Sequence, residues 1–156
     1  IVYEINAEPA AREYARALGI APDTLSDGSF AANPVVVRIG NDHHVRAILK
    51  LGENGALEFA SAIDEGVVLI LAQPSDISDH LRRKFDALSK AARPDTILAC
   101  DCLWRRIEIA DKQATREISA ILSKNAVIGF NTYGEQFDSL HVNHTMTGVA
   151  IYPPAG

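Results

Sequence analysis

The hydrophobic positions of the chain change their spacing several times, which predicts a mixture of strands and helices. Residues 1–6 alternate between apolar and polar side chains, as a half-buried strand does. Apolar side chains between residues 10 and 18 recur instead at helical spacing behind Pro9, and Gly19 supplies a natural helix end. Turn-forming residues dominate 21–33, which predicts a loop.

The middle of the chain has the pattern of antiparallel strands. A short strand is predicted over 34–39, and a hairpin follows with arms at 44–51 and 56–60. Asn54-Gly55 between the arms favours the positive φ angles of a type I′ turn. Residues 67–72 are apolar throughout, which is typical of a central strand.

Helices return in the second half of the chain. Ser75-Asp76 supplies an N-cap for a predicted helix over 76–92. Residues 96–102 predict a buried strand that continues into 103–107. Asp111 is expected to cap a third helix. Two apolar runs, 127–135 and 141–151, predict the last strands.

This order of elements predicts an α+β fold with a mixed, largely antiparallel sheet and about three helices packed on it. The 156 residues are 47% hydrophobic and contain no linker or internal repeat, so we expect residues 1–156 to form a single domain. The chain opens at Ile1 and its only methionine is Met146. We therefore expect it to be a fragment of a longer protein.

Composition excludes several classes of function. A net charge of -5 argues against a nucleic-acid partner, which would need a basic face. No apolar run has the length of a membrane span, and no signal peptide is visible. In a strand, Cys100 and Cys102 would place their thiols about 7 Å apart, too far for an easy disulfide. We expect reduced thiols and a cytoplasmic location.

Polar side chains gather where the first of the last two apolar runs, 127–135, ends and the second, 141–151, begins. So many hydrogen-bonding groups at strand ends exceed what a hairpin needs, and they predict the edge of a small-molecule pocket. The group consists of Asn131, Thr132, Tyr133, Glu135, His141, Asn143, His144 and Thr145.

Each of these groups has a functional and a structural interpretation. Glu135 is a candidate acceptor for a ligand ammonium, or a cap beside the tight turn at Gly134. His141, Asn143 and Thr145 share one face if the segment is extended, where they would bind a carboxylate or carbonyl or form a solvated polar ladder. His144 would point the other way, which favours a structural role.

Three further groups are candidates outside this segment. Arg46 would clamp a ligand carboxylate, or form an ion pair with Glu135 or Asp101. Asp101 and Arg105 are better ligand candidates than the two neighbouring cysteines, which we interpret as buried small hydrophobes. A cysteine nucleophile would need a base such as His141.

Several segments, in this order and at these separations, resemble the C-terminal domain of the FIST family. They are His44-Val-Arg-Ala-Ile48, Asn54-Gly-Ala-Leu-Glu-Phe59, Asp64-Glu-Gly66, Cys100-Asp-Cys-Leu-Trp-Arg105, Gly129-Phe-Asn-Thr-Tyr-Gly-Glu-Gln136 and His141-Val-Asn-His-Thr145. The resemblance covers nearly the whole chain. One departure is His144, where the family pattern has glutamine.

The resemblance implies a bacterial or archaeal sensory module that follows an N-terminal FIST domain. Such modules are thought to bind small ligands, with amino acids proposed, and to report to histidine kinases, cyclic-di-GMP enzymes or chemotaxis receptors. We accordingly expect a ligand-binding domain without catalytic or metal-binding residues. Its expected site residues are Arg46, Asp101, Arg105, Asn131, Tyr133, Glu135, His141, Asn143 and Thr145.

Two alternatives from other classes of function remain. One family branch contains haem-binding nitric oxide sensors, so haem is the alternative cofactor, with His43, His44, His80 and His141 as candidate ligands. Adjacent histidines on a strand face opposite ways, and a solvated loop is the favoured interpretation of His43-His44. The other alternative is a cysteine-dependent enzyme built on Cys100 or Cys102.

Overall fold

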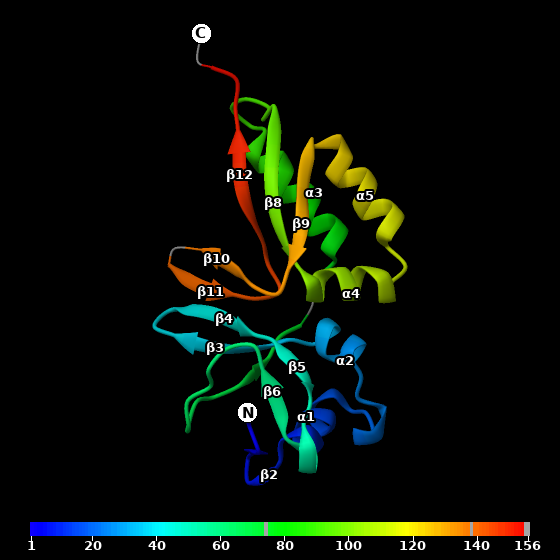
Figure 1. The fold of residues 1–156 in the computed structure, drawn as a ribbon, viewed down its shortest axis with the longest axis vertical. Helices are drawn as coiled ribbons and strands as arrows, with labels where there is room; N and C mark the ends of the chain where they lie inside the picture. The colour runs from blue at the N-terminus through cyan, green and yellow to red at the C-terminus, as the bar shows by residue number, and fades with distance from the viewer. Residues whose placement is uncertain (74, 138, 155–156) are drawn as a thin grey trace.

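The computed structural model describes residues 1–73, 75–137 and 139–154. The molecule is elongated, with the N-terminal half of the chain at one end and the C-terminal half at the other (Figure 1). The described residues contain five α-helices, and antiparallel pairs make up most of the strand pairing. The α+β fold class is therefore confirmed. No helix in these three ranges combines the length and apolar content of a membrane span.

The N-terminal end is built from small sheets and two short helices. Its core is formed by side chains of helix α1, helix α2 and strands β3, β5 and β6. The elements are β1 (Glu4–Ile5), β2 (Glu8–Pro9), α1 (Ala10–Leu18), a 3₁₀ turn (Pro22–Thr24), α2 (Asp27–Ala32), β3 (Val35–Ile39), β4 (Asp42–Arg46), β5 (Ile48–Leu51), a second 3₁₀ turn (Glu53–Gly55), β6 (Leu57–Phe59) and β7 (Ile70–Leu71).

The C-terminal end is a three-stranded sheet with helices on one face. Strand β8 is central, parallel to β9 and antiparallel to β12. Helices α3 and α5 pack their apolar stripes on β8 through Leu81, Phe85, Ile97 and Ile118. The elements are α3 (Ile77–Leu88), β8 (Thr96–Cys102), α4 (Leu103–Asp111), α5 (Thr115–Lys124), β9 (Val127–Thr132), β10 (Glu135–Phe137), β11 (Leu140–Val142) and β12 (Met146–Ile151).

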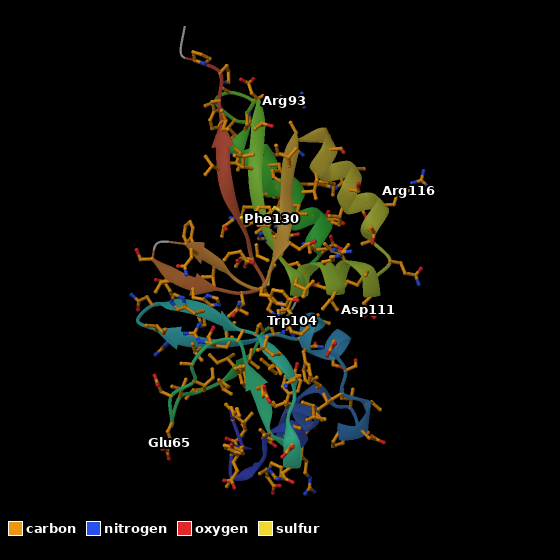
Figure 2. All side chains as sticks on the ribbon, in the orientation of Figure 1. Glu65, Arg93, Trp104, Asp111, Arg116 and Phe130 are labelled. Carbon is orange, nitrogen blue, oxygen red and sulfur yellow. The ribbon has the colours of Figure 1, made fainter. Side chains whose placement is uncertain are left out.

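The other face of this sheet is apolar and exposed. Ile128 is 58% exposed, Phe130 69% and Val149 61%, and Leu98 lies between Ile128 and Val149 in register. Figure 2 shows the position of Phe130 on β9.

A small buried cluster joins the two ends of the molecule. It contains Ala31 of α2, Ala47 between β4 and β5, and Cys102 and Trp104 at the start of α4. Trp104 lies where the two halves meet (Figure 2). The hairpin β10–β11 also lies against β4 across this junction.

Three local sequence signals are confirmed by the structure. Helix α1 ends at Leu18 and Gly19 adopts φ 71°, the left-handed conformation that glycine favours. Asp76 caps α3 by accepting a hydrogen bond from the Asp79 amide at 2.8 Å. Strands β5 and β6 pair across Asn54-Gly55, both at positive φ.

Other predicted boundaries are wrong. Residues 103–107 continue as helix α4 instead of a strand, because Trp104, Arg105 and Ile109 then bury one helical face. The predicted loop 21–33 contains α2, which Ser26 starts with a capping box. The third predicted helix starts at Thr115, and Asp111 ends α4.

Two strand predictions also need correction. The predicted hairpin arm 44–51 divides at Ala47, so that β4 pairs with β3 and only β5 pairs with β6. The apolar run 67–72 forms only the short edge strand β7, with Val68 72% exposed.

Candidate ligand-binding site

The carboxyl ends of the parallel strands β8 and β9 bring polar groups together at one edge of the sheet. In register, Asp101 lies opposite Asn131, and Cys102 lies opposite Thr132. Strand β12 enters at the same edge, where the Thr145 carbonyl accepts the Cys102 amide at 3.0 Å. Ligands commonly bind outside the carboxyl ends of parallel strands, so this edge is a natural position for a site.

A largely buried ion pair forms the centre of this edge. Arg105 Nε donates to Asp101 Oδ1 at 2.5 Å, and the two side chains are 11% and 15% exposed. Burial raises the pKa of the Asp101 carboxyl, and the charge of Glu135 raises it further, while Arg105 opposes both effects. The pair therefore fixes the guanidinium at the start of α4.

Glu135 is enclosed by threonine hydroxyls. Its side chain is almost fully buried at 3% exposure. Thr132 donates its hydroxyl to one carboxylate oxygen, and Thr145 donates to the other at 2.7 Å. Both oxygens thus have partners within the protein, which makes Glu135 a bridge between the end of β9 and the start of β12.

A second network surrounds Asn143, which is fully buried. Its Nδ2 lies 3.2 Å from His141 Nε2 and 3.5 Å from the Tyr133 carbonyl, while Ser61 donates to its Oδ1 at 3.2 Å. A Cβ atom on Gly134 would lie only 2.7 Å from His141 Nε2. The turn therefore needs glycine so that His141 can reach Asn143.

Two buried nitrogen atoms beside these networks have no hydrogen-bond partner within the described residues. They are Nη2 of Arg105, whose residue is 9% exposed, and Nε2 of His144. Nearly all buried polar groups in proteins are paired, and leaving one unpaired costs about 1–3 kcal/mol, with more for a charged group. The unpaired guanidinium nitrogen therefore marks this edge of the sheet as a candidate binding site.

Both residues line one groove of about 950 Å³. Its walls are the inner side of β12, the helix α3 and the end of β10, and its apolar side chains include Leu81, Phe85, Leu88, Ile97 and Met146. Small-molecule sites are typically about 300–1,000 Å³, mostly apolar, with a few directed polar groups. The groove matches this description.

His144 presents a neutral ring to the groove. Burial, and then the charge of Arg105, lower its pKa to about 4. The ring stacks on Trp104 with centroids 6.2 Å apart and planes inclined by 9°. Its backbone has φ 54°, so the chain turns sharply here and residues 143–145 lie outside the regular strands.

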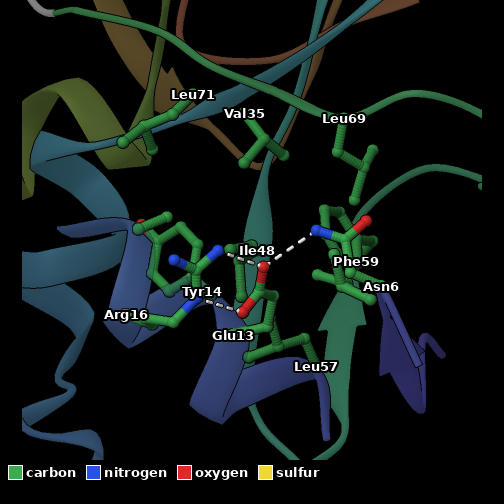
Figure 3. A pocket seen from close by; sticks show the side chains of 12 residues that line it. Asn6, Glu13, Tyr14, Arg16, Val35, Ile48, Leu57, Phe59, Leu69 and Leu71 are labelled. Atoms are coloured by element: carbon green, nitrogen blue, oxygen red, sulfur yellow. Dashed lines mark hydrogen bonds and ion pairs between the residues drawn. The ribbon is translucent and has the colours of Figure 1, made fainter. Parts of the chain in front are cut away.

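A second cavity, in the N-terminal end, is smaller and its polar groups are satisfied (Figure 3). Its volume is about 190 Å³. Glu13 in its wall accepts hydrogen bonds from Arg16 at 2.6 and 2.7 Å and from Asn6 at 2.8 Å. These partners lower its pKa to about 2. The closed ion pair makes a structural role the better interpretation.

The structure brings most of the expected site residues to this edge of the sheet. One network holds Asp101, Arg105, Glu135 and Thr145, and the other holds His141, Asn143 and the Tyr133 carbonyl. Asn131 is exposed at the rim, where Nδ2 donates to the Asp101 carbonyl at 3.2 Å. The Tyr133 side chain itself is 81% exposed.

Arg46 lies apart from the groove. It is on β4, and its guanidinium donates to the neighbouring Val45 carbonyl at 3.3 Å. None of the ion pairs formed by the described residues includes Arg46. The alternative of an ion pair with Glu135 or Asp101 is therefore wrong, because Asp101 pairs with Arg105 and Glu135 accepts hydrogen bonds from Thr132 and Thr145.

The two cysteines are free thiols. Cys102 is fully buried, and burial raises its pKa. A thiol with a raised pKa is protonated at neutral pH, whereas nucleophilic catalysis needs the thiolate. The environment of Cys102 is that of a core residue.

The histidines bear on the haem alternative. Of the four histidines considered from sequence, His80 lines the groove, whereas His43, His44 and His141 do not. The described residues contain no group of three or more His, Cys, Asp or Glu side chains that could hold a metal ion. A haem ligand in the groove would therefore come from His80 or His144.

Some contributors were not among the expected site residues. Thr132 and His144 belong to the polar group seen in the sequence, but a structural role was favoured for His144 on the premise of an extended backbone, which its left-handed conformation overturns. Ser61 joins the network of Asn143, and Lys84 lines the groove from α3; no sequence signal singled out either residue. Trp104, Arg105 and Ile109 are spaced for a helix, but the apolar residues of this segment also suit a strand, so no local signal placed Arg105 at a helix start.

Comparison with known proteins identifies the family of the chain. The family model described as FIST C domain matches residues 10–138. The chain therefore belongs to the FIST C domain family, a family of sensory domains in signal transduction. No curated protein and no solved structure matches the chain.

Proposed function

We propose that this domain senses a small organic molecule, which binds in the groove between α3 and β12. The observation that carries the proposal is the buried Nη2 of Arg105, a charged donor without a partner in the described residues, on a side chain that lines a groove of ligand size. Asp101 holds this guanidinium in place, so the donor is preorganised for a ligand.

The local chemistry supports binding rather than catalysis. The groove is lined by apolar side chains, hydrogen-bond donors and a neutral imidazole. Cys102, the buried thiol near His144, has a raised pKa and thus lacks the character of a nucleophile. A domain with these features recognises its ligand and leaves it unchanged.

Family membership supports the proposed relay of binding to a signalling output. We propose an N-terminal FIST domain as a neighbour and a histidine kinase, a cyclic-di-GMP enzyme or a chemotaxis receptor as the output. The site suits a relay because Glu135 and Thr145 connect the groove to the hairpin β10–β11, which lies against β4 at the junction. The two free thiols support a cytoplasmic location.

A thermal-shift screen of amino acids, organic acids and other small polar metabolites tests the proposal. A ligand present at about a thousand times its Kd stabilises the folded state by about 4 kcal/mol, which is a large shift. We expect at least one compound to raise the melting temperature of the wild type. The increase should be lost in the double variant Asp101→Asn/Arg105→Gln and kept in Arg116→Gln.

The two variants are designed as a pair. The double substitution removes the Arg105 donor without leaving Asp101 as an unpaired buried charge. Arg116 is exposed on α5, away from the groove, so its variant controls for the loss of one positive charge. An increase that persists in the double variant, or a screen without any stabilising compound, would overturn the proposal. An absorbance spectrum of the purified protein tests the haem alternative, which predicts a Soret band.

A further inference from the structure

The groove has two chemically different ends. Arg105 and His144 mark one end, close to the carboxyl ends of β8 and β9. Leu88 and Ala150 mark the other, where Tyr152 donates its hydroxyl to the Leu88 carbonyl at 2.9 Å. The helix α3 spans the distance between them, about 12 Å from residue 80 to residue 88. A ligand that fills the groove therefore needs a polar head and an apolar body.

The polar end offers hydrogen-bond donors. Arg105 contributes its guanidinium, and Nε2 of His144 donates in one of its two tautomers. Lys84 also lines the groove, one turn of α3 beyond His80. None of the described residues that line the groove is acidic. Asp101 and Glu135 lie outside the lining; Asp101 Oδ1 accepts a hydrogen bond from Arg105, and the two Glu135 oxygens accept from Thr132 and Thr145.

The positive charge of Arg105 lowers the pKa of a histidine on each wall of the groove. It contributes to the lowered pKa of His144 on the β12 side and of His80 on the α3 side, where Lys84 and Arg83 act in the same direction. In both residues burial is the larger cause. Two imidazoles on opposite walls thus experience a positive potential, which favours an anionic head group.

The apolar end offers no partner for a second charged group. Phe85, Leu88 and Ile97 form its walls together with the backbone of β12. Burying an unpaired ammonium group or carboxylate there would be costly, whereas a hydrocarbon body gains from burial at about 25 cal/mol per Å².

We infer that the ligand is a monocarboxylic acid with an apolar body, whose carboxylate is held by the guanidinium of Arg105 and the imidazole of His144. The inference rests on the proposed function and names the ligand class of the same groove. It differs from the α-amino acids that the sequence led us to expect. The described lining has no carboxylate to pair with an α-ammonium group, because Glu135 lies outside it with both oxygens engaged by threonine hydroxyls. A neutral acceptor such as Gln136 would not offset the repulsion between that group and Arg105.

Calorimetric titration with four matched probes tests this assignment. The probes are 4-methylpentanoate, its neutral analogue 4-methylpentanamide, leucine, which adds an ammonium group to the same skeleton, and acetate, which lacks the body. We expect 4-methylpentanoate to bind about tenfold or more tightly than the amide, because the amide has no negative charge to pair with the Arg105 guanidinium. Leucine and acetate should also bind at least about tenfold more weakly.

Protein variants identify the two ends. The variant Asp101→Asn/Arg105→Gln should weaken 4-methylpentanoate by about tenfold or more. Leu88→Ser should weaken decanoate, whose longer body reaches the far end of the groove, by several-fold while leaving acetate unchanged. Arg116→Gln should have no effect, and circular dichroism should show that each variant is folded. Equal binding of the amide, tighter binding of leucine, or an unchanged affinity in the double variant would overturn the inference.

The outcomes also separate this inference from the proposed function. If 4-methylpentanoate fails but the metabolite screen finds another ligand that depends on Arg105, the assigned class is wrong and the sensory groove stands. If neither experiment finds a ligand, both are wrong.

Discussion

Asp101 and Arg105 form an ion pair between the end of β8 and the first turn of α4, with 2.5 Å between Oδ1 and Nε. The pair uses only one edge of the guanidinium. Nη2 of the same group remains buried without a partner in the described residues, and the Arg105 side chain lines the groove. One carboxylate thus positions a cation beside the groove in which we propose that a ligand binds.

The ion pair predicts a specific pattern of stability. Arg105→Gln leaves the Asp101 carboxylate buried without its partner and should lower the free energy of unfolding by about 3 kcal/mol or more. Adding Asp101→Asn removes the unpaired charge and should restore much of the loss. Urea unfolding at pH 7 measures both variants, with exposed Arg116→Gln as the control, expected within about 0.5 kcal/mol of wild type. An Arg105→Gln variant as stable as the control would contradict the pairing.

His144 predicts a loss of stability in mild acid. Its pKa is about 4 in the folded protein, against an ordinary value of 6.5, so the unfolded chain binds a proton first as the pH falls. The neutral ring therefore contributes fully to the free energy of unfolding above pH 6.5. This contribution, at most about 3 kcal/mol, is lost as the pH falls towards 4. Unfolding experiments across this range should show the loss in wild type and a smaller one in His144→Gln. Identical profiles would refute a buried neutral ring.

Glu13 predicts a second, more acidic effect in the N-terminal end. Its pKa is lowered to about 2 from 4.5, chiefly by the hydrogen bonds from Arg16, so the ionised form is favoured by folding. This contribution is present above pH 4.5 and disappears as the pH falls to 2. Relative to Glu13→Gln, the wild type should lose stability between these values. A constant difference between the two proteins would mean that the ion pair in Figure 3 does not form in solution.

The thiols predict an order of alkylation. Cys102 is fully buried with a raised pKa, whereas Cys100 is partly exposed. Iodoacetamide at neutral pH should therefore modify Cys100 before Cys102, and mass spectrometry of the digested protein locates the label. Rapid modification of Cys102 would contradict its assignment as a core residue and would revive the cysteine-dependent enzyme.

The success of the sequence predictions followed how local each signal was. Gly19 ends α1 and Asp76 starts α3 through contacts within one turn, so both could be predicted. Helix α4 could not, because its apolar residues also suit a strand, and the choice depends on the packing of Trp104 against Ala47 and Ala31. Tertiary contacts therefore determine that this segment forms a helix and not a strand.

The same distinction applies to the site. Asp101 and Arg105 could be selected from sequence, and their i,i+4 spacing becomes an ion pair because α4 starts between them. The role of His144 could not be predicted, since it depends on a positive φ angle and on stacking against Trp104. Arg46 has similar chemistry to Arg105, and only the fold separates it from the groove.

The most direct test of ligand binding in the groove between α3 and β12 is an NMR titration of ¹⁵N-labelled protein with a mixture of organic acids and amino acids. The account predicts chemical-shift changes in the amides of α3 and β12 that line the groove, together with the ring nitrogens of His144 and the side-chain nitrogens of Arg105. Changes confined to the cavity around Glu13 and Tyr14, or no changes at all, would contradict it.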